Sequence, residues 1–341
     1  MSSLVKNKVV QRGQLLYPRM KQAMAISLSQ RRRMLSTVTM DNSIRKERDT
    51  PSASAAEAYI QGDKTHFGFE DVSISEKEGR VREVFESVAE SYDVMNDLMS
   101  GGLHRYWKDE LLAMTGVEGM ARAIRRRQFS KSGTKSGFSI LDVAGGTGDV
   151  SFRFLEAAGC QERAKSSGED EVTITVCDIN SEMLRVGEQR AKERYGMDVL
   201  HSSKALQFIQ GNAQSLPFQD NQYDIYTIAF GLRNVTDVDM ALRDAYRVLK
   251  PGGRYLCLEF SHVTNPAFRT LYDTFSFHAI PTMGELVAND RASYQYLVES
   301  IRKFSNQDEL QRRIEDAGFI GCKYTNMTGG IVAIHEGWKP L

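Results

Sequence analysis

Three closely spaced glycines, Gly145, Gly146 and Gly148, are the feature of this sequence that most directly indicates chemistry. They lie in the run ILDVAGGTGD over residues 140–149, whose pattern indicates a buried strand, a glycine loop and the first turn of a helix. Glycines permit a tight turn and let backbone N–H groups approach a ligand closely. Such a strand–loop–helix predicts a small molecule bound at the carboxyl edge of a parallel sheet.

The residues around this loop narrow the choice of ligand. The loop has the spacing G-G-x-G, whereas the dinucleotide fingerprint requires G-x-G-x-x-G. Asp178 directly follows a second apolar strand, where its carboxylate is placed to accept hydrogen bonds from both hydroxyls of a ribose. A glycine loop with that acid resembles the S-adenosylmethionine site of the Rossmann-like methyltransferases. A nucleotide- or flavin-binding α/β domain is the alternative.

Two later strand ends carry further candidate site residues. Asn212 and Ala213 follow the third strand, where an amide can contact the rim of an adenine and a small side chain leaves room for its ring. A plain turn is the alternative, because Asn and Gly are suited to turns. Arg233 and Asn234 follow the fourth strand, whose end lies beside the reacting group in such a sheet. They are therefore candidates to contact the acceptor, and an exposed loop is the alternative.

Alternating strand and helix patterns must position these residues. Strand patterns occur at 139–144, 172–177, 206–210, 224–230, 254–260, 319–325 and 331–336. Helical patterns occur between them, at about 148–158, 181–194, 237–249 and 306–317. The order predicts an α/β fold with a seven-stranded, mostly parallel sheet and helices on both faces. Together with the resemblance of the glycine loop and Asp178, this implies the Rossmann-like class I S-adenosylmethionine-dependent methyltransferase fold. Because the last two strands are so close in sequence, one strand near an edge is expected to be antiparallel.

Residues 263–304 interrupt this alternation with a long aromatic stretch that includes Phe268, Tyr272, Phe275 and Tyr296. A segment of this kind after a fifth strand is predicted to form a lid over an apolar substrate. A pair of helices packed as ordinary core is the alternative.

Composition excludes several classes of function. The 44 basic and 44 acidic residues cancel, which argues against a nucleic-acid partner. No apolar run reaches the length of about 18 residues that a transmembrane helix requires. The four cysteines form no C-x-x-C motif or His/Cys cluster, so no metal site is expected and a reducing compartment is favoured.

The N-terminal segment has a composition of its own. Residues 1–40 are basic and serine-rich without an acid, which is typical of a mitochondrial transit peptide. A disordered basic arm that binds an anionic surface is the alternative. Residues 41–75 predict a flexible lead-in to one domain over 76–341. Within that domain, polar surface insertions are expected at 124–137 and 161–171.

Three segments carry a specific family resemblance. Residues 92–107 and 247–261 resemble the two signatures of the ubiquinone/menaquinone biosynthesis C-methyltransferase family, and residues 231–236 also match it. The resemblance covers about residues 75–341. It implies S-adenosylmethionine as methyl donor, held beside the glycine loop by Thr147, Asp178, Asn212 and Ala213. A further family contact, often a serine, falls on Ala229, where only a backbone or packing contact can remain.

The resemblance also implies a reaction, the C-methylation of a polyprenyl benzoquinol ring in ubiquinone biosynthesis. A ring carbon is a weak nucleophile, so a ring hydroxyl must lose its proton before transfer and the ring proton must leave afterwards. We predict that Arg233 and Asn234 hold that hydroxyl, or a water that takes its proton. Tyr92 and His104 are further candidates, and for His104 a packed or capping histidine is the alternative.

A polyprenyl substrate resides in a bilayer, and this sequence has no spanning segment. We therefore expect peripheral attachment to the matrix face of the mitochondrial inner membrane, with residues 263–304 near the point of substrate entry. The resemblance further implies other ubiquinone-biosynthesis enzymes as partners and leaves a homodimer open. Two rival functions remain: an O-methyltransferase acting on a soluble phenol, and a scaffold that binds the donor mainly to stabilise a multi-enzyme assembly.

Overall fold

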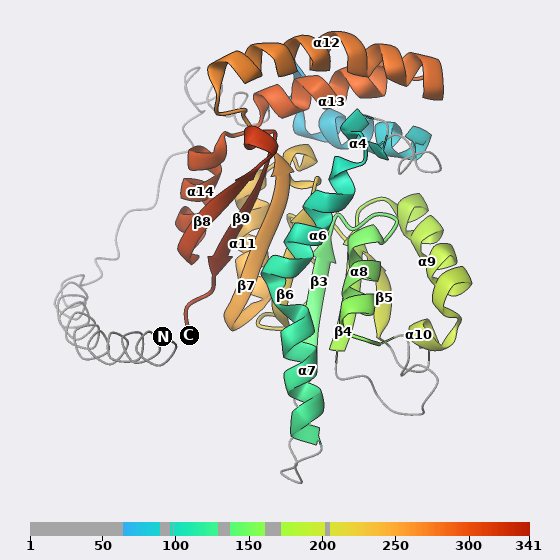
Figure 1. Ribbon diagram of the computed structural model, residues 1–341, viewed down its shortest axis with the longest axis vertical. Helices are drawn as coiled ribbons and strands as arrows, with labels where there is room; N and C mark the ends of the chain where they lie inside the picture. The colour runs from blue at the N-terminus through green and yellow to red at the C-terminus, as the bar shows by residue number, and fades with distance from the viewer. Residues whose placement is uncertain (1–63, 89–95, 98, 129–136, 161–171, 202–204) are drawn as a thin grey trace, which may run out of the picture. The chain divides into compact units, whose positions relative to one another are not determined.

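The computed structural model describes residues 64–88, 96–97, 99–128, 137–160, 172–201 and 205–341 (Figure 1). All of them belong to one compact unit, Ala58–Leu341. The predicted transit peptide over 1–40, Tyr92 and the predicted insertion at 161–171 lie outside the described residues.

A seven-stranded sheet forms the centre of this unit (Figure 1). Its spatial order is β5 (Leu206–Gln210), β4 (Val172–Asp178), β3 (Phe138–Val143), β6 (Tyr223–Ala229), β7 (Leu249–Phe260), β9 (Val332–Trp338) and β8 (Ile320–Met327). The first five strands are parallel, and β9 is antiparallel to both of its neighbours. The predicted sheet, with its antiparallel strand next to one edge, is confirmed.

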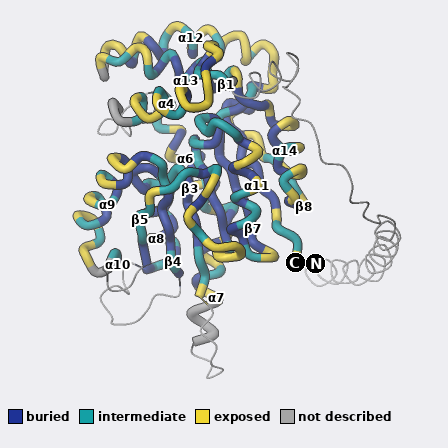
Figure 2. Tube along the Cα trace, turned by 180° about the vertical axis from the view of Figure 1, so that it is seen from behind, coloured by how far each residue is buried: buried dark blue, intermediate teal, exposed yellow. Residues whose placement is uncertain are grey.

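Helices cover both faces of the sheet, as Figure 1 shows. The helices on one face are α6 (Leu103–Thr115), α7 (Val117–Gln128), α8 (Asp149–Ala157) and α9 (Ser181–Tyr195), followed by the short α10 (Asp198–His201). The other face carries α11 (Val238–Val248) and α14 (Gln307–Asp316). The inner strands β3, β4, β6 and β9 are accordingly buried over most of their length, whereas the edge strand β8 is largely exposed (Figure 2). Ile140 packs in the core of the first face and Leu141 in that of the second, which explains the unbroken apolar strand pattern.

Local capping explains why the helix boundaries were predictable. Asn180, Asp237 and Asn306 each accept hydrogen bonds from backbone N–H groups in the first turn of α9, α11 and α14. The four predicted helices agree with the structure to within one residue at either end. The start of strand β7 differs more from the prediction, which placed it at residue 254. The strand begins at Leu249, which pairs with Tyr223 beyond an irregularity in the register.

The predicted flexible lead-in over 41–75 is wrong for its described part. Strands β1 (Lys64–Phe67) and β2 (Glu70–Ser73) form an antiparallel hairpin, and helix α4 (Ile74–Val88) begins directly after it. The Phe67 ring stacks on Tyr296 at a centroid distance of 4.0 Å, which fixes the hairpin to the domain. The predicted insertion at 124–137 is also shorter than expected, because α7 continues to Gln128.

Two helices, α12 (Pro266–Ala288) and α13 (Arg291–Lys303), make up most of the region predicted to form a lid, and they form a layer above the sheet (Figure 1). They pack closely, since a side chain at Gly284 would overlap the Tyr294 ring. Ile280, Tyr294 and Val298 form a small core of their own. The region is thus a helical pair, and it also lines a cavity described below. Among the described residues, no helix is long and apolar enough to span a membrane.

The connections place a ligand crevice at one point of the sheet. From β3 the chain continues outward through β4 and β5, and it then returns to β6 on the opposite side of β3. The loops after β3 and β6 therefore diverge and leave a gap at the carboxyl ends of the strands. The short helix η1 (Leu232–Asn234) follows β6 at this gap.

Candidate active site

A cavity of about 140 Å³ lies at the carboxyl ends of β3, β4 and β6. Seven of the eight predicted donor-binding residues line it: Gly145, Gly146, Thr147, Asp178, Asn212, Ala213 and Ala229. Gly148 is not part of the lining. It adopts a left-handed conformation with φ 85° at the start of α8, so its role is to turn the loop into the helix.

The glycine loop packs too closely against the sheet to accept a side chain at Gly145. A Cβ atom there would lie 2.7 Å from Val176, and Gly146 has φ +52°, a conformation that favours glycine. The loop is closed by a hydrogen bond of 2.8 Å from the Gly148 amide to the Gly145 carbonyl. The tight turn of the loop therefore requires glycine at these positions.

Asp178 stands at the tip of β4 with its carboxylate held by the backbone. One oxygen accepts from the Gly146 amide and the other from the Asn180 amide, each at 2.9 Å. Burial raises the pKa of Asp178 to about 6 against the lowering effect of these bonds. Each carboxylate oxygen can accept a second hydrogen bond, so the group suits two adjacent ribose hydroxyls.

The turn after β5 forms another part of the cavity wall. The Asn212 side-chain oxygen accepts from the Gln214 amide at 3.0 Å, and its Nδ2 atom donates to Glu78 on α4 at 3.3 Å. Ala213 is buried beside it. The Asn212 amide is thus oriented by its neighbours, and the small side chain of Ala213 leaves space for an adenine ring.

A second, larger cavity of about 450 Å³ lies between the sheet and the α12–α13 layer. Its lining is mainly apolar and aromatic, with Trp107, Phe260, Tyr272, Phe275, Tyr294 and Tyr296 among its residues. Phe85, Lys108 and Phe230 line both cavities. The two cavities therefore adjoin at these three residues, which is the arrangement that group transfer between two ligands requires.

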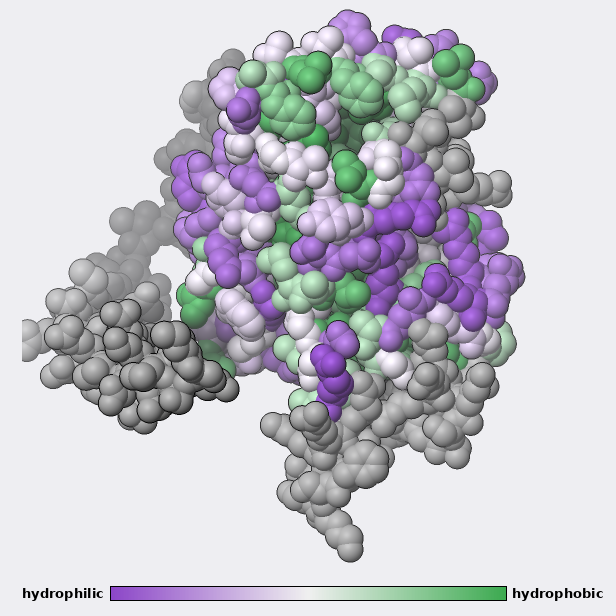
Figure 3. Space-filling view, viewed as in Figure 1, coloured by the Kyte–Doolittle hydropathy of each residue, from purple (hydrophilic) through white to green (hydrophobic). Residues whose placement is uncertain are grey.

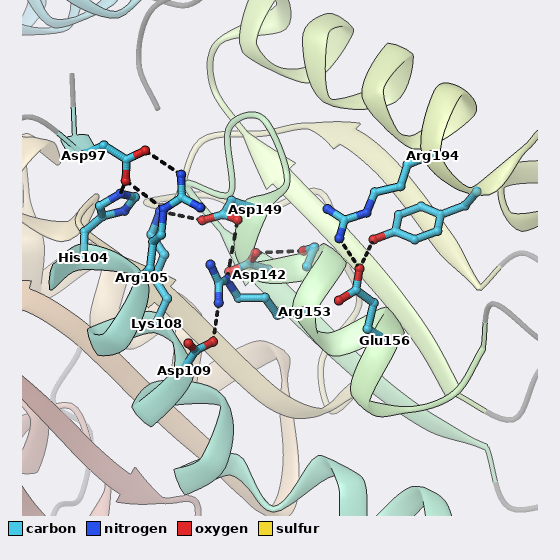
Figure 4. A network of polar contacts seen from close by, with 12 residues as sticks. Asp97, His104, Arg105, Lys108, Asp109, Asp142, Asp149, Arg153, Glu156 and Arg194 are labelled. Atoms are coloured by element: carbon cyan, nitrogen blue, oxygen red, sulfur yellow. Dashed lines mark hydrogen bonds and ion pairs between the residues drawn. The ribbon is translucent and has the colours of Figure 1, made fainter. Parts of the chain in front are cut away.

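His104 lies in the wall of the second cavity and is paired with an acid (Figure 4). Its Nε2 atom is 2.7 Å from Asp97 Oδ1, and Arg105 donates to both oxygens of Asp97. These bonds keep the pKa of Asp97 well below its usual range. An ionised carboxylate can only accept, so Nε2 is the donor and Nδ1 carries the lone pair. Nδ1 has no hydrogen-bond partner among the described residues.

Arg233 and Asn234 face different cavities. Arg233 lines the second cavity and Asn234 the first. Arg233 is 5% exposed and forms an ion pair of 2.9 Å with Glu259, which is 1% exposed. Asn234 accepts a hydrogen bond of 3.0 Å from the hydroxyl of Tyr296 on α13. The two residues that the sequence grouped together therefore have separate surroundings.

The Arg233–Glu259 pair gives a stability prediction. Glu259→Ala leaves the guanidinium buried without its counter-charge, so we expect the free energy of unfolding to fall by about 3–5 kcal/mol. The double variant Arg233→Met/Glu259→Leu removes both charges and is expected to recover most of that loss. Urea denaturation followed by circular dichroism measures both. A decrease in the free energy of unfolding of less than about 1 kcal/mol for Glu259→Ala would show that the ion pair does not stabilise this part of the cavity wall.

Sequence reasoning missed the ion pair of 2.7 Å between Lys108, which is buried and lines both cavities, and Asp149, which is half-buried and lines the first. A signal was present, since His104, Lys108 and Leu111 share one face of α6 and all are buried. A lysine on a buried helical face is rare unless it is paired. Among the described residues, no group of histidine, cysteine and acidic side chains could hold a metal ion.

The fold and the site together define the class of protein. A glycine loop after β3, an acid at the tip of β4 and an Asn–Ala turn after β5 form one cavity at the switch point of a seven-stranded sheet. This combination of fold and residues is that of a Rossmann-like S-adenosylmethionine-dependent methyltransferase.

Comparison with known proteins identifies the family. The model of the ubiE/COQ5 methyltransferase family matches residues 73–339, and the chain belongs to this family. The predicted family resemblance is thereby confirmed. The match begins in β2, close to the predicted domain boundary.

Three relatives illustrate the similarity. A mitochondrial 2-methoxy-6-polyprenyl-1,4-benzoquinol methylase of Gallus gallus is 48% identical over 83% of this chain and 92% of its own length. The Homo sapiens protein of the same name is 48% identical over 81% of this chain and 84% of its own length. A ubiquinone/menaquinone biosynthesis C-methyltransferase UbiE of Bradyrhizobium diazoefficiens is 50% identical over 82% of this chain and 98% of its own length.

Proposed function

We propose that this chain transfers a methyl group from S-adenosylmethionine to a ring carbon of a polyprenyl benzoquinol, of the 2-methoxy-6-polyprenyl-1,4-benzoquinol type, in ubiquinone biosynthesis. The names of the relatives support this substrate. The observation that carries the proposal is the large aromatic cavity that adjoins the donor cavity at Phe85, Lys108 and Phe230. A flat ring with a long apolar tail requires such a space beside the donor.

In our proposal, the predicted residues that line the donor cavity have separate roles. When bound, S-adenosylmethionine supplies an electrophilic methyl group on a sulfonium sulfur. Asp178 accepts hydrogen bonds from the ribose, while Asn212 and Ala213 contact the adenine. Thr147 adds a hydroxyl beside the glycine loop. Ala229 contributes a backbone or packing contact only, because its methyl group has no hydrogen-bonding atom.

Proton removal is the task that this chain's side chains perform on the acceptor. In our proposal, Nδ1 of neutral His104 takes the proton of a ring hydroxyl, and Asp97 stabilises the imidazolium that forms. The phenolate makes the ring electron-rich at carbon. After the new carbon–carbon bond forms, the ring proton is lost to solvent and the product oxygen takes back the proton held by His104, so the net reaction releases one proton.

Arg233 and Asn234 act beside this pair. Arg233 is ion-paired with Glu259, so we propose that it orients the ring hydroxyl rather than removing its proton. Asn234 lines the donor cavity and accepts a hydrogen bond from Tyr296, which lines the acceptor cavity. Tyr92 stays a further candidate for contact with the acceptor.

The α12–α13 layer serves in this proposal as the cap over the acceptor, with its outer face towards a membrane. Leu271, Phe275 and Leu286 are exposed on α12, and apolar residues gather over this layer in Figure 3. Phe275 also lines the cavity, so the exposed apolar face continues into the site. We propose peripheral attachment to the matrix side of the mitochondrial inner membrane, after removal of residues 1–40.

The partners in this proposal are other ubiquinone-biosynthesis enzymes, which would deliver and receive the quinol. The proposal does not depend on whether the chain forms a homodimer.

A tail-length comparison tests the proposed substrate. The full chain is incubated with S-adenosylmethionine labelled in its methyl group and with a benzoquinol that carries either a short prenyl tail or a methyl group in its place. Because the tail buries apolar surface in the second cavity, we expect KM to be at least about tenfold lower for the prenylated ring. Phe275→Ser is expected to narrow that difference. Equal KM values, or preferred labelling of a soluble phenol, would favour the O-methyltransferase alternative.

A further inference from the structure

The ion pair between Lys108 and Asp149 has no role in the proposed proton transfer. Lys108 lies on α6, and its Nζ atom is 2.7 Å from Oδ2 of Asp149, the first residue of α8 (Figure 4). The Lys108 side chain is 7% exposed and that of Asp149 is 34% exposed. Both residues line the donor cavity, and Lys108 also lines the acceptor cavity.

We propose that Lys108 and Asp149 bind the α-amino-acid end of the methyl donor, Lys108 through the carboxylate and Asp149 through the ammonium group. This inference rests on the proposed function. It names a part of the donor to which no predicted contact has been assigned, since Asp178 serves the ribose and Asn212 and Ala213 serve the adenine.

The position of the pair supports this assignment. Asp178 and Asn212 hold the nucleoside portion on the β4 and β5 side of the loop. The reacting group must lie where the two cavities adjoin, at Phe85, Lys108 and Phe230. The amino-acid end is attached to the same sulfur as the methyl group, so it must lie near that junction too. Lys108 is itself one of the three junction residues, and Asp149 is its ion-pair partner.

The hydrogen-bonding capacity of the pair also fits a zwitterion. A lysine ammonium has three donors, and Asp149 is the one acceptor that the described residues provide for it. Asp149 has a second oxygen, whose nearest cation is Arg153 at 3.5 Å. Burial raises the pKa of Asp149, but the ion pair with Lys108 outweighs this and lowers the pKa overall. A carboxylate and an ammonium can therefore join the pair without leaving a charge unbalanced.

The other charged groups of the donor cavity are less suited to this role. Asp142 accepts from Ser151 and Thr227 and lies below the loop. Glu78 accepts from Asn212. Arg82 on α4 is exposed, so a carboxylate bound there would remain in contact with water.

Two ligands that differ only in the amino-acid end test the proposal. S-adenosylhomocysteine has that end, whereas 5′-methylthioadenosine lacks it. We measure the Kd of both by isothermal titration calorimetry with the full chain and its Lys108→Met and Asp149→Asn variants. Lys250→Met is the matched control, because Lys250 forms a similar pair of 2.6 Å with Asp224 at the start of β6, away from both cavities.

The expected result is selective. Lys108→Met raises the Kd of S-adenosylhomocysteine by at least about tenfold, which corresponds to the loss of roughly one charge-assisted hydrogen bond. The same variant changes the Kd of 5′-methylthioadenosine by less than about twofold. Lys108→Arg retains the charge and recovers part of the affinity. Lys250→Met changes neither Kd.

Three outcomes would overturn the inference. Equal weakening of both ligands would show that the pair only joins α6 to α8. Unchanged binding of S-adenosylhomocysteine would show that the amino-acid end lies elsewhere. A wild-type chain that binds neither ligand would contradict the proposed function itself, and the inference with it.

Discussion

Replacing His104 with glutamine is expected to lower kcat by about 10²–10⁴-fold while the Kd of S-adenosylmethionine changes less than about twofold. Glutamine retains a hydrogen bond to Asp97 and much of the side-chain volume, but it cannot take a proton. His104 lines the acceptor cavity and not the donor cavity, so donor binding should not change. Steady-state kinetics with a prenylated benzoquinol and calorimetry with the donor measure the two quantities.

The pH profile separates proton transfer from a structural role. Burial lowers the pKa of His104 below its ordinary value of 6.5, and the hydrogen bond to Asp97 opposes this only in part. The neutral form is the active one, so the wild-type kcat should stay constant at neutral pH and fall only below about pH 6.5. His104→Gln should lack this acid limb. His278→Gln, on the exposed face of α12, is the control and should behave as wild type. A His104→Gln variant that retains both its rate and the acid limb would exclude His104 as proton acceptor.

Asp178→Asn is the second change with a large expected effect. An amide provides one acceptor oxygen where the carboxylate has two, so one ribose hydroxyl loses its partner. Hydrogen bonds to charged groups contribute about 1.5–3 kcal/mol, and we therefore expect the Kd of S-adenosylmethionine to rise about 10–100-fold. Calorimetric titration of the purified variant measures it.

The pKa of Asp178, raised to about 6 by burial, gives this variant a pH signature. As the pH falls through about 6, the free wild-type protein protonates Asp178 and its affinity for the donor decreases. Asp178→Asn has no such group and should show a flat affinity over that range. Asp224→Asn, remote from the cavity, should keep the wild-type profile. Donor affinity that is unchanged in Asp178→Asn would contradict the assigned ribose contact.

The central sheet could be predicted because its signals are local. The central strands are short segments rich in apolar and β-branched residues, such as VTITVCD in β4. The helices between them begin at side chains that cap their own first turn, as Asn180 does for α9. The donor site followed from the same order, since the loops after β3, β4 and β5 must meet at one edge of a parallel sheet. Gly148 shows the limit, because spacing alone cannot separate a lining glycine from a turning one.

The features that the sequence did not reveal depend on distant contacts. The β1–β2 hairpin has strands of only four residues each, and its place in the fold depends on Phe67 stacking against Tyr296. Arg233 could be assigned to the site, but its pairing with Glu259 joins residues 26 positions apart. Lys108 meets Asp149 across 41 positions. No periodic pattern records such a pair, so its electrostatic consequences required the structure.

One measurement tests the central claim most directly: where the transferred methyl group is attached. The full chain is incubated with S-adenosylmethionine that carries a ¹³C-methyl group and with a short-tailed 2-methoxy benzoquinol, and the extracted product is examined by ¹³C NMR. We predict a single labelled methyl bonded to a ring carbon, absent from the product of Asp178→Asn at donor concentrations that saturate the wild type only. A labelled methyl bonded to oxygen, or an unlabelled quinol recovered from a chain that binds the donor, would contradict the proposed function.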